Sequence, residues 1–277
     1  MLRWVSFWFV FIHGAGYVEA QLSHLQAGSG YLRSGAYGKD FTDAFSFRSN
    51  PACLGSAHYA MAGCLGERKW MLPELGGYEM AMVLPVFQGG IGLALQYSGD
   101  AAFHEQAVQL AYGKNMGLLE AGIHFNILRS QAQGYRGSNF LNAGIGLRFH
   151  VNDKIISGWE LDLPVASFPG KASTEKAPQL FSMGIGYEPG PEWLLVLQLE
   201  KVSGVPVNIY PGIEYCYAGQ FIFSFGICSS NGALYFKSGW IKNGVSIQIY
   251  SLYEPLLGFT PGLVFLWKAE KGGHERP

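Results

Sequence analysis

The nine residues from Leu119 to Ile127, LEAGIHFNI, alternate strictly between apolar side chains and polar or small ones. The apolar set is Leu119, Ala121, Ile123, Phe125 and Ile127, and the other set is Glu120, Gly122, His124 and Asn126. Alternation with a period of two places the sets on opposite faces of a β-strand, whereas helical spacing would put Glu120 among apolar side chains. The stretch therefore predicts a strand with one face in an apolar medium and the other in a polar or crowded one.

The same alternation recurs along the chain, for example in FLNAGIGLRFH (140–150) and AGQFIFSFGIC (218–228). Turn signals such as Asn231-Gly232 and Asn243-Gly244 separate the runs, and both residue types tolerate positive φ. We expect about fourteen strands, an even number as in bacterial barrels, and many are as long as the ~9–11 residues of a tilted membrane strand. Their expected ranges are 57–64, 78–86, 89–98, 104–113, 118–129, 139–150, 155–162, 179–187, 192–201, 206–215, 219–228, 233–240, 244–253 and 260–267.

The composition agrees with strands that face an apolar medium. Only 14% of the 277 residues are charged and 15% are aromatic, against roughly 25% charged in an average soluble protein. A net charge of −1 gives no attraction to nucleic acid, so we expect no nucleic-acid partner. Aromatic residues lie at or near the expected strand ends, as in the girdles at the two membrane interfaces. They are Trp70, Tyr78, Tyr97, Tyr112, Tyr187, Trp193, Tyr215, Trp240, Tyr253 and Trp267.

The first twenty residues have the layout of a secretory signal. Arg3 precedes an apolar run from Trp4 to Ile12, and Val18-Glu19-Ala20 is a small-x-small cleavage signal before Gln21. Residues 1–20 are thus expected to be a signal peptide, 21–56 an N-terminal plug or hatch, 57–268 the barrel and 269–277 a C-terminal tail. The expected fold class is all-β, a transmembrane antiparallel barrel in the bacterial outer membrane and in contact with its lipid. The alternative is a soluble β-sandwich, which would have shorter strands and more charge on its solvent face.

The barrel hypothesis directs a set of polar side chains into the lumen, opposite the aliphatic face. The candidate lumen residues are Glu79, Glu120, His124, Arg148, Glu160, Glu200, Glu214 and Lys237, with His150 and Asp162 beside them. Many inward positions are glycine, which leaves room next to these charges. Such a lumen could hold water, a ligand or an N-terminal plug, and the residues alone leave these three open.

Catalytic and metal-binding signals are weak, so we expect a non-enzymatic protein without cofactors. Cys53 and His58 are close in sequence, but nothing identifies the third group that would orient the histidine. The histidines show no metal-ligand spacing. Cys216 and Cys228 are expected at opposite ends of neighbouring strands, too far apart for a disulfide. Free thiols are therefore the main expectation, with a pairing of Cys53 and Cys64 as the alternative.

The segment DAFSFRSNPACLG (43–55) resembles the N-terminal segment of PorV/PorQ-like outer-membrane proteins, which are associated with type IX secretion and related to FadL transporters. Further stretches are similar to hairpins of that family, including MAGCLGERKWMLPELGGYEMAMVLP (61–85), SMGIGYEPGPEWLLVLQLEK (182–201) and the final GFTPGLVFLWK (258–268). The resemblance spans about residues 43–268. The chain departs from the family in its trimmed loops and in the tail after Trp267-Lys268.

The resemblance implies a fourteen-stranded, FadL-like barrel with an accessory role in protein secretion or surface export. Its partners would be secretion-system components or the C-terminal signals of secreted proteins. The alternative is a FadL-type channel for long-chain fatty acids or other hydrophobic compounds, with such a compound as ligand and a lateral opening near Pro206 or Pro211. Asn50, Pro51 and Ala52 would then form a hinge between the plug and the first strand, because Pro51 disfavours a helical Asn50 and the Asn side chain can bond nearby backbone.

Overall fold

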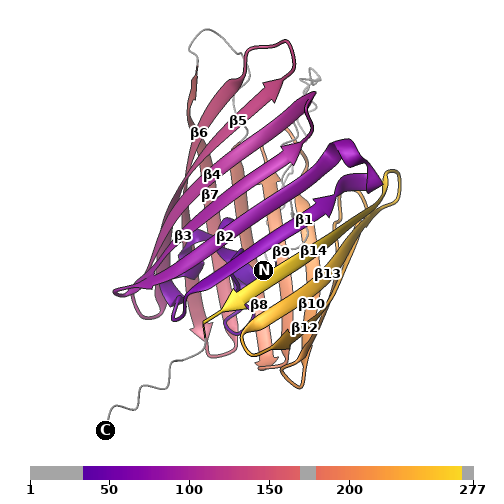
Figure 1. The fold of residues 1–277 in the computed structure, drawn as a ribbon. Helices are drawn as coiled ribbons and strands as arrows, with labels where there is room; N and C mark the ends of the chain where they lie inside the picture. The colour runs from indigo at the N-terminus through magenta and orange to yellow at the C-terminus, as the bar shows by residue number, and fades with distance from the viewer. Residues whose placement is uncertain (1–33, 169–178, 270–277) are drawn as a thin grey trace, which may run out of the picture.

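Fourteen antiparallel strands close into a single barrel in the computed structural model, which describes residues 34–168 and 179–269 (Figure 1). Each strand pairs with its neighbours in sequence, and β1 pairs with β14 to close the wall, so no sheet edge remains. The strands are β1 Met61–Arg68, β2 Gly76–Val86, β3 Gly89–Gly99, β4 Phe103–Asn115, β5 Leu119–Ala132, β6 Ser138–Asn152, β7 Ile155–Phe168, β8 Leu180–Gly190, β9 Trp193–Val202, β10 Asn208–Tyr217, β11 Phe221–Ile227, β12 Leu234–Lys242, β13 Val245–Glu254 and β14 Gly258–Lys268.

The predicted alternation divides the wall into two faces. On β5, Ile123, Phe125 and Ile127 are about half exposed, at 46%, 51% and 55%, whereas Glu120 and His124 between them are buried. Large apolar side chains are exposed on the outer face of every strand from β2 to β14. An apolar outer belt with polar side chains inside is the pattern of a transmembrane β-barrel, so the expected fold class is confirmed and the soluble sandwich is excluded.

The two rims of the barrel differ in their connections. At the rim where β1 begins and β14 ends, which we call the proximal rim, all six connections have two or three residues. One of them is the predicted Asn243-Gly244 turn, in which both residues have positive φ, 51° and 73°. The opposite, distal rim has longer connections, such as Lys69–Leu75 between β1 and β2.

Aromatic side chains gather near both rims on the outer face. Tyr187, Trp193, Tyr215, Trp240 and Trp267 lie toward the proximal rim, and Trp193 packs on Tyr215 with ring centroids 4.2 Å apart. Tyr78, Tyr97 and Tyr253 lie toward the distal rim. Trp70 is outside this pattern, because it belongs to the distal connection and donates its indole N–H to Glu254.

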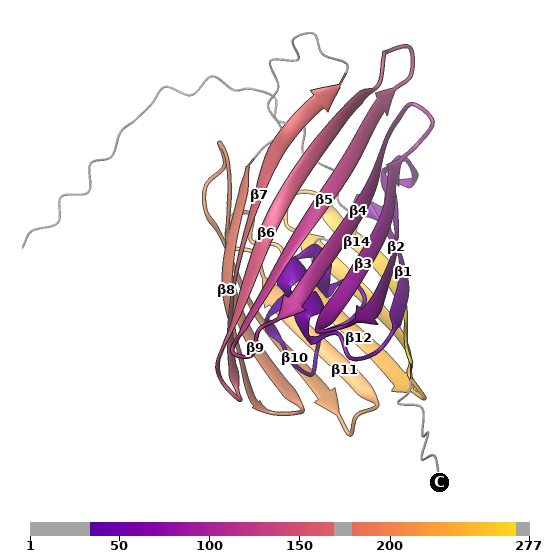
Figure 2. The same cartoon turned by 90° about the vertical axis from the view of Figure 1, so that its left-hand side faces the viewer.

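Residues 34–60 enter the barrel instead of extending the wall, and we call them the inner segment. They form three short 3-10 helices, η1 Gly35–Tyr37, η2 Ser46–Arg48 and η3 Pro51–Ser56. Both views show this indigo segment inside the wall, in the half that is nearer the proximal rim (Figures 1 and 2). Two more 3-10 turns, η4 Lys69–Met71 and η5 Pro73–Leu75, lie at the distal rim.

The first strand differs from its expected range of 57–64. Ala57 still belongs to the inner segment, where its N–H closes η3 by bonding the Leu54 carbonyl, and β1 begins only at Met61. Residues 57–60, which precede the strand, were included in the predicted range although they belong to the inner segment.

Among residues 34–168 and 179–269, no helix has the length and apolar character needed to cross a bilayer.

Candidate functional site

The inner segment packs closely against glycines on the inner face of the wall. A Cβ added at Gly184 would lie 2.5 Å from Cζ of Tyr37, and one at Gly92 would lie 2.9 Å from the Phe47 ring. A Cβ at Gly122 would overlap the backbone of Pro51. These glycines are therefore required by close approach of the inner segment. The room that they leave is occupied by the chain itself, at least in the half of the lumen near the proximal rim.

Asn50 joins the inner segment to two strands of the wall. Its Oδ1 accepts a hydrogen bond from the Ala52 N–H at 3.0 Å, which caps η3, and its backbone is extended as Pro51 requires. Its Nδ2 donates to the carbonyl oxygens of Leu147 on β6 and Trp159 on β7, at 3.3 and 3.1 Å. Asn50, Pro51 and Ala52 are all buried, so the predicted Asn turn exists and is also a bridge to the wall.

Arg48 makes a second set of bonds to another part of the wall, β2–β4. Its Nε lies 3.1 Å from Glu79 Oε1 on β2, and its two terminal nitrogens donate to Gln109 on β4 (2.6 Å) and Gln96 on β3 (2.9 Å). The guanidinium and the carboxylate are both buried. Removing one partner of such a pair leaves an uncompensated buried charge, so the pair holds the inner segment against β2–β4.

The third connection runs through Arg148 on β6. Its Nη1 lies 3.2 Å from Glu120 Oε2 on β5, and His150 Nε2 lies 3.1 Å from the other oxygen of Glu120. Arg148 also donates to the Gly38 carbonyl at 2.9 Å and to Ser56 Oγ at 3.4 Å, both in the inner segment. Glu120 and Arg148 thus form a fully buried pair that holds two separate parts of the inner segment.

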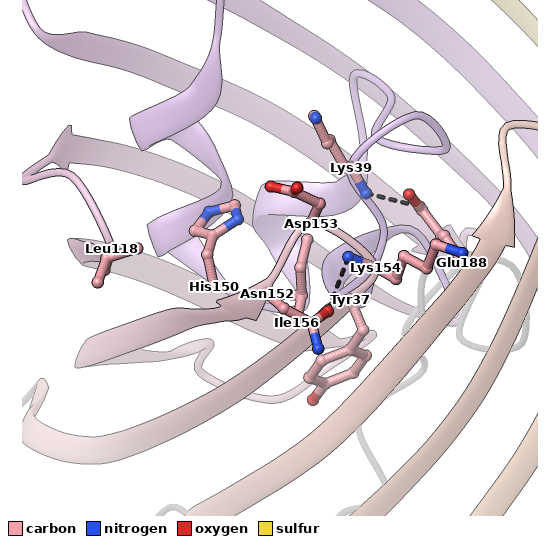
Figure 3. Close-up of a pocket in the computed structure, with 9 residues that line it drawn as sticks. All are labelled: Tyr37, Lys39, Leu118, His150, Asn152, Asp153, Lys154, Ile156 and Glu188. Atoms are coloured by element: carbon pink, nitrogen blue, oxygen red, sulfur yellow. Dashed lines mark hydrogen bonds between the residues drawn. The ribbon is translucent and has the colours of Figure 1, made fainter.

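Near the proximal rim, Glu188 on β8 receives the backbone of the inner segment. One oxygen accepts from the Lys39 N–H at 2.7 Å and from the Asp40 N–H at 3.3 Å (Figure 3). A cavity of about 100 Å³ lies here between Lys39, His150 and the β6–β7 turn. Tyr37 extends from this place into the barrel, where its hydroxyl lies 3.1 Å from Ser182 Oγ.

The buried cysteine of the inner segment is not arranged for catalysis. The Cys53 thiol donates to the carbonyl oxygens of Ala36 (3.5 Å) and Ser46 (3.8 Å), while His58 is exposed. Burial raises the pKa of Cys53 to about 11, although Arg148 nearby opposes the shift, so the nucleophilic thiolate is scarce at neutral pH. All four cysteines are free, and Cys53 lies inside the wall while Cys64 is exposed on its outer face, which excludes their pairing.

The remaining candidate lumen residues make three separate sets of contacts. Lys237 on β12 bonds Glu214 on β10 at 2.8 Å, and Ser224 and Ser34 also donate to that carboxylate. His124 on β5 lies between Glu160 and Asp162 of β7, with Nδ1 3.8 Å from Glu160 and Nε2 3.7 Å from Asp162. Glu200 accepts a hydrogen bond from the Tyr210 hydroxyl at 3.4 Å. Among the described residues, no group of three His, Cys, Asp or Glu side chains could hold a metal ion.

The sequence did not identify Arg48, Gln96, Gln109 and Glu188 as parts of this site. Glu188 has the same parity as the inward Ser182, Gly184 and Gly186, so continuing the alternation to the end of β8 could have found it. The sequence contains no signal for the role of Arg48, because this residue precedes the first strand and lies in no alternating stretch that would assign its side chain to a face. Pro206 lies in the β9–β10 connection and Pro211 lies within β10.

The fold is shared with known transporters, although the sequence is not. The chain matches the Ralstonia pickettii toluene transporter TbuX with a TM-score of 0.58 at 12% identity, covering 86% of this chain and 96% of that one. It matches the Pseudomonas putida toluene transporter TodX with a TM-score of 0.59 at 8% identity, covering 85% and 95%. A Pseudomonas aeruginosa FadL homologue gives a TM-score of 0.57 at 10% identity, covering 85% and 95%.

Neither protein-family models nor curated proteins match the sequence. At such low identities the structural matches establish the fold, a FadL-like outer-membrane barrel, and nothing finer.

Proposed function

We propose that this chain is an outer-membrane conduit for small hydrophobic compounds, in which the inner segment is the gate. The observation that carries the proposal is the inner segment itself. It is folded, buried and bonded to the wall from β2 to β8, yet it is joined to the wall covalently only at β1. Such a segment closes the lumen while its polar contacts to the wall are made. It opens the lumen when those contacts break and the segment moves away from the wall. The fold shared with TbuX and TodX, both titled toluene transporters, supports the hydrophobic substrate class.

The proposed orientation follows from the rims. Barrels of the outer membrane have short turns at the periplasm and longer loops outside the cell. The proximal rim would therefore face the periplasm, and the inner segment would obstruct the periplasmic half of the lumen. Residues 1–20, the proposed signal peptide, lie outside the described residues. N-terminal sequencing of the mature protein from outer-membrane fractions tests cleavage between Ala20 and Gln21.

A reducible tether tests the gate. Ala57 lies beside β3, and a Cβ at Gly90 would be 2.8 Å from the Ala57 Cβ. A separation of about 3.8 Å is needed for a disulfide, so the pair Ala57→Cys and Gly90→Cys requires a shift of about 1 Å. We expect the oxidised double variant to block uptake of a labelled hydrophobic compound into lipopolysaccharide-containing vesicles, and reduction to restore it. Each single variant is the control.

Uptake that is the same in oxidised, reduced and untethered protein would show that the inner segment is not a gate. Uptake no faster than in protein-free vesicles would overturn the conduit itself.

The role in type IX secretion implied by the PorV/PorQ resemblance stays a prediction, since two of the matched structures reported above are toluene transporters. Its test is deletion of the gene: unchanged surface display of secreted cargo would remove the secretion role and leave the barrel unaffected.

A further inference from the structure

Acidic side chains outnumber basic ones on the described inner face of the barrel. The acids are Glu67, Glu79, Glu105, Glu120, Glu160, Asp162, Glu188, Glu200 and Glu214. The cations inside are Arg48, Arg148 and Lys237, with Lys69 at the distal rim. The inner face therefore carries more acidic than basic side chains, and such an excess in a narrow low-dielectric space favours cations over anions.

The three cations inside the barrel are each bonded to one acid. Arg48 pairs with Glu79, Arg148 with Glu120, and Lys237 with Glu214. Glu188 is satisfied by two backbone N–H groups, and Glu67 accepts a hydrogen bond from Tyr250. The carboxylates of Glu160 and Asp162 differ, because the side chain between them is a histidine whose ring nitrogens lie 3.7–3.8 Å away, beyond hydrogen-bond distance.

Five polar side chains meet on β5, β6 and β7 in this place, and we call them the acidic cluster: His124, Asn126, Asn142, Glu160 and Asp162. In the registers of these strands, Asn126 is opposite Asn142, and Gly144 lies between His124 and Asp162. The imidazole covers Gly144, where a Cβ would overlap it. The cluster is next to the gate, because Gly146, the neighbouring inward position on β6, contacts Asn50 and Pro51.

Several buried atoms of the acidic cluster have no hydrogen-bond partner among the described residues. They are His124 Nδ1, Asn126 Oδ1, Asn142 Oδ1 and Asp162 Oδ1. His124 itself is only 3% exposed. Three of the four atoms are oxygens that can only accept, and buried acceptors without donors are costly. The cluster is therefore built to receive a group that brings hydrogen-bond donors and positive charge.

We propose that the acidic cluster binds the positively charged nitrogen of an amphiphilic ligand, so that the conduit prefers hydrophobic amines to fatty acids. The inference rests on the proposed conduit function and assigns its substrate class. An alkylammonium group presents three N–H donors and one positive charge, which match the acceptors and carboxylates of the cluster. A carboxylate ligand would bring a like charge next to Glu160 and Asp162 and leave the same acceptors without donors.

The preference can be measured with three ligands of one chain length: heptylammonium, heptanol and heptanoate. Their binding to the purified full chain in a nonionic detergent is followed by calorimetry, with protein-free micelles as the blank. We expect heptylammonium to bind about tenfold or more tighter than heptanoate, which corresponds to at least one charge-assisted hydrogen bond. In the variant with Glu160→Gln and Asp162→Asn, that preference should disappear.

A matched double variant separates the cluster from the general field of the lumen. Glu67→Gln with Glu105→Gln removes two negative charges from the same inner face without altering the cluster. This variant should keep most of the preference for heptylammonium. An equal loss in both double variants would overturn the assignment to the acidic cluster.

The outcomes also separate this inference from the conduit proposal. If heptanol binds but heptylammonium and heptanoate bind equally, the cluster is a hydrated surface and the amine inference is wrong while the conduit stands. If none of the three ligands binds, and hydrophobic compounds enter vesicles no faster than without protein, the conduit proposal fails and the inference fails with it.

Discussion

Arg48 of the inner segment and Glu79 of β2 face each other inside the barrel, with Nε and Oε1 3.1 Å apart and both side chains almost fully buried. The pair connects a segment that precedes the barrel to the second strand of its wall. Neither charge has access to bulk water, so each depends on the other for compensation. The stability of the closed gate therefore depends strongly on this contact.

Replacing one partner should open the gate without unfolding the barrel. In Arg48→Ala, Glu79 stays buried without its cation, which costs about 3–5 kcal/mol for an isolated buried charge. We expect faster hydrogen exchange at residues 34–60 and unchanged heat-modifiable migration on gels. The double variant Arg48→Met with Glu79→Gln removes both charges and should recover much of the protection. If Arg48→Ala exchanged as slowly as the native chain, the pair would not hold the gate.

Asn50→Ala should loosen the inner segment by a different route. It removes the cap of η3, worth about 0.5–2 kcal/mol, and removes the side-chain hydrogen bonds to the carbonyl oxygens of Leu147 and Trp159, worth about 0.5–1.5 kcal/mol each. Asn50→Asp keeps the cap acceptor and loses the donor, so it should lie between the native chain and Asn50→Ala. The release temperature of the inner segment is measured in each protein as the temperature at which residues 34–60 become sensitive to proteolysis, and these temperatures rank the three proteins. Equal release temperatures for all three proteins would contradict the bridging role.

A single added methyl group should displace the inner segment. Gly122→Ala places a Cβ against the backbone of Pro51, whereas Gly190→Ala on β8 meets no atom within 4 Å and is the matched control. We expect Gly122→Ala to raise single-channel conductance in planar bilayers, because Pro51 must move away from β5. Gly190→Ala should conduct like the native chain. The same conductance in both variants would show that the wall and the inner segment are not in tight contact.

The packing of the inner segment should weaken in alkali through Cys53. Its pKa in the folded chain is about 11, above the ordinary value of 9, so the folded state retains the thiol proton more strongly than the released state does. The stabilisation is complete below pH 9 and is lost as the pH rises toward 11, by about 3 kcal/mol at most. Maleimide labelling of Cys53 should thus rise steeply between pH 9 and 11. In Cys53→Ser, proteolytic release of the segment should lack this pH dependence.

The wall of the barrel is predictable because each strand is specified by the pattern of its own residues. In LEAGIHFNI the alternation assigns a face to every residue, and it does so without knowledge of any distant contact. The Asn243-Gly244 turn is equally local, since positive φ at both residues selects a tight hairpin. An open sheet of fourteen such strands would leave two unpaired edges, and closing the sheet into a barrel removes both.

The contacts inside the lumen could not be predicted for the opposite reason, although the alternation did direct Glu79, Glu120 and Arg148 inward. Arg48 is 31 residues from Glu79 in the chain, and nothing in SFRSNPA indicates that an arginine there would pair with a glutamate on the second strand. The inward glycines were visible, but whether they faced water, ligand or chain depended on a segment without any periodicity. The predicted range of the first strand, 57–64, was wrong in the same region, because the inner segment ends and the wall begins only at Met61.

The sequence alone thus determined the barrel, its inner and outer faces and its hairpins, because strand alternation and turn chemistry act between residues close in the chain. Only the tertiary structure decided that residues 34–60 pack against the inner face of the wall, that Asn50 bridges β6 and β7, and that His124 lies between Glu160 and Asp162. Those contacts join residues far apart in the chain, and they exist only after the closed wall has fixed the distances across its interior.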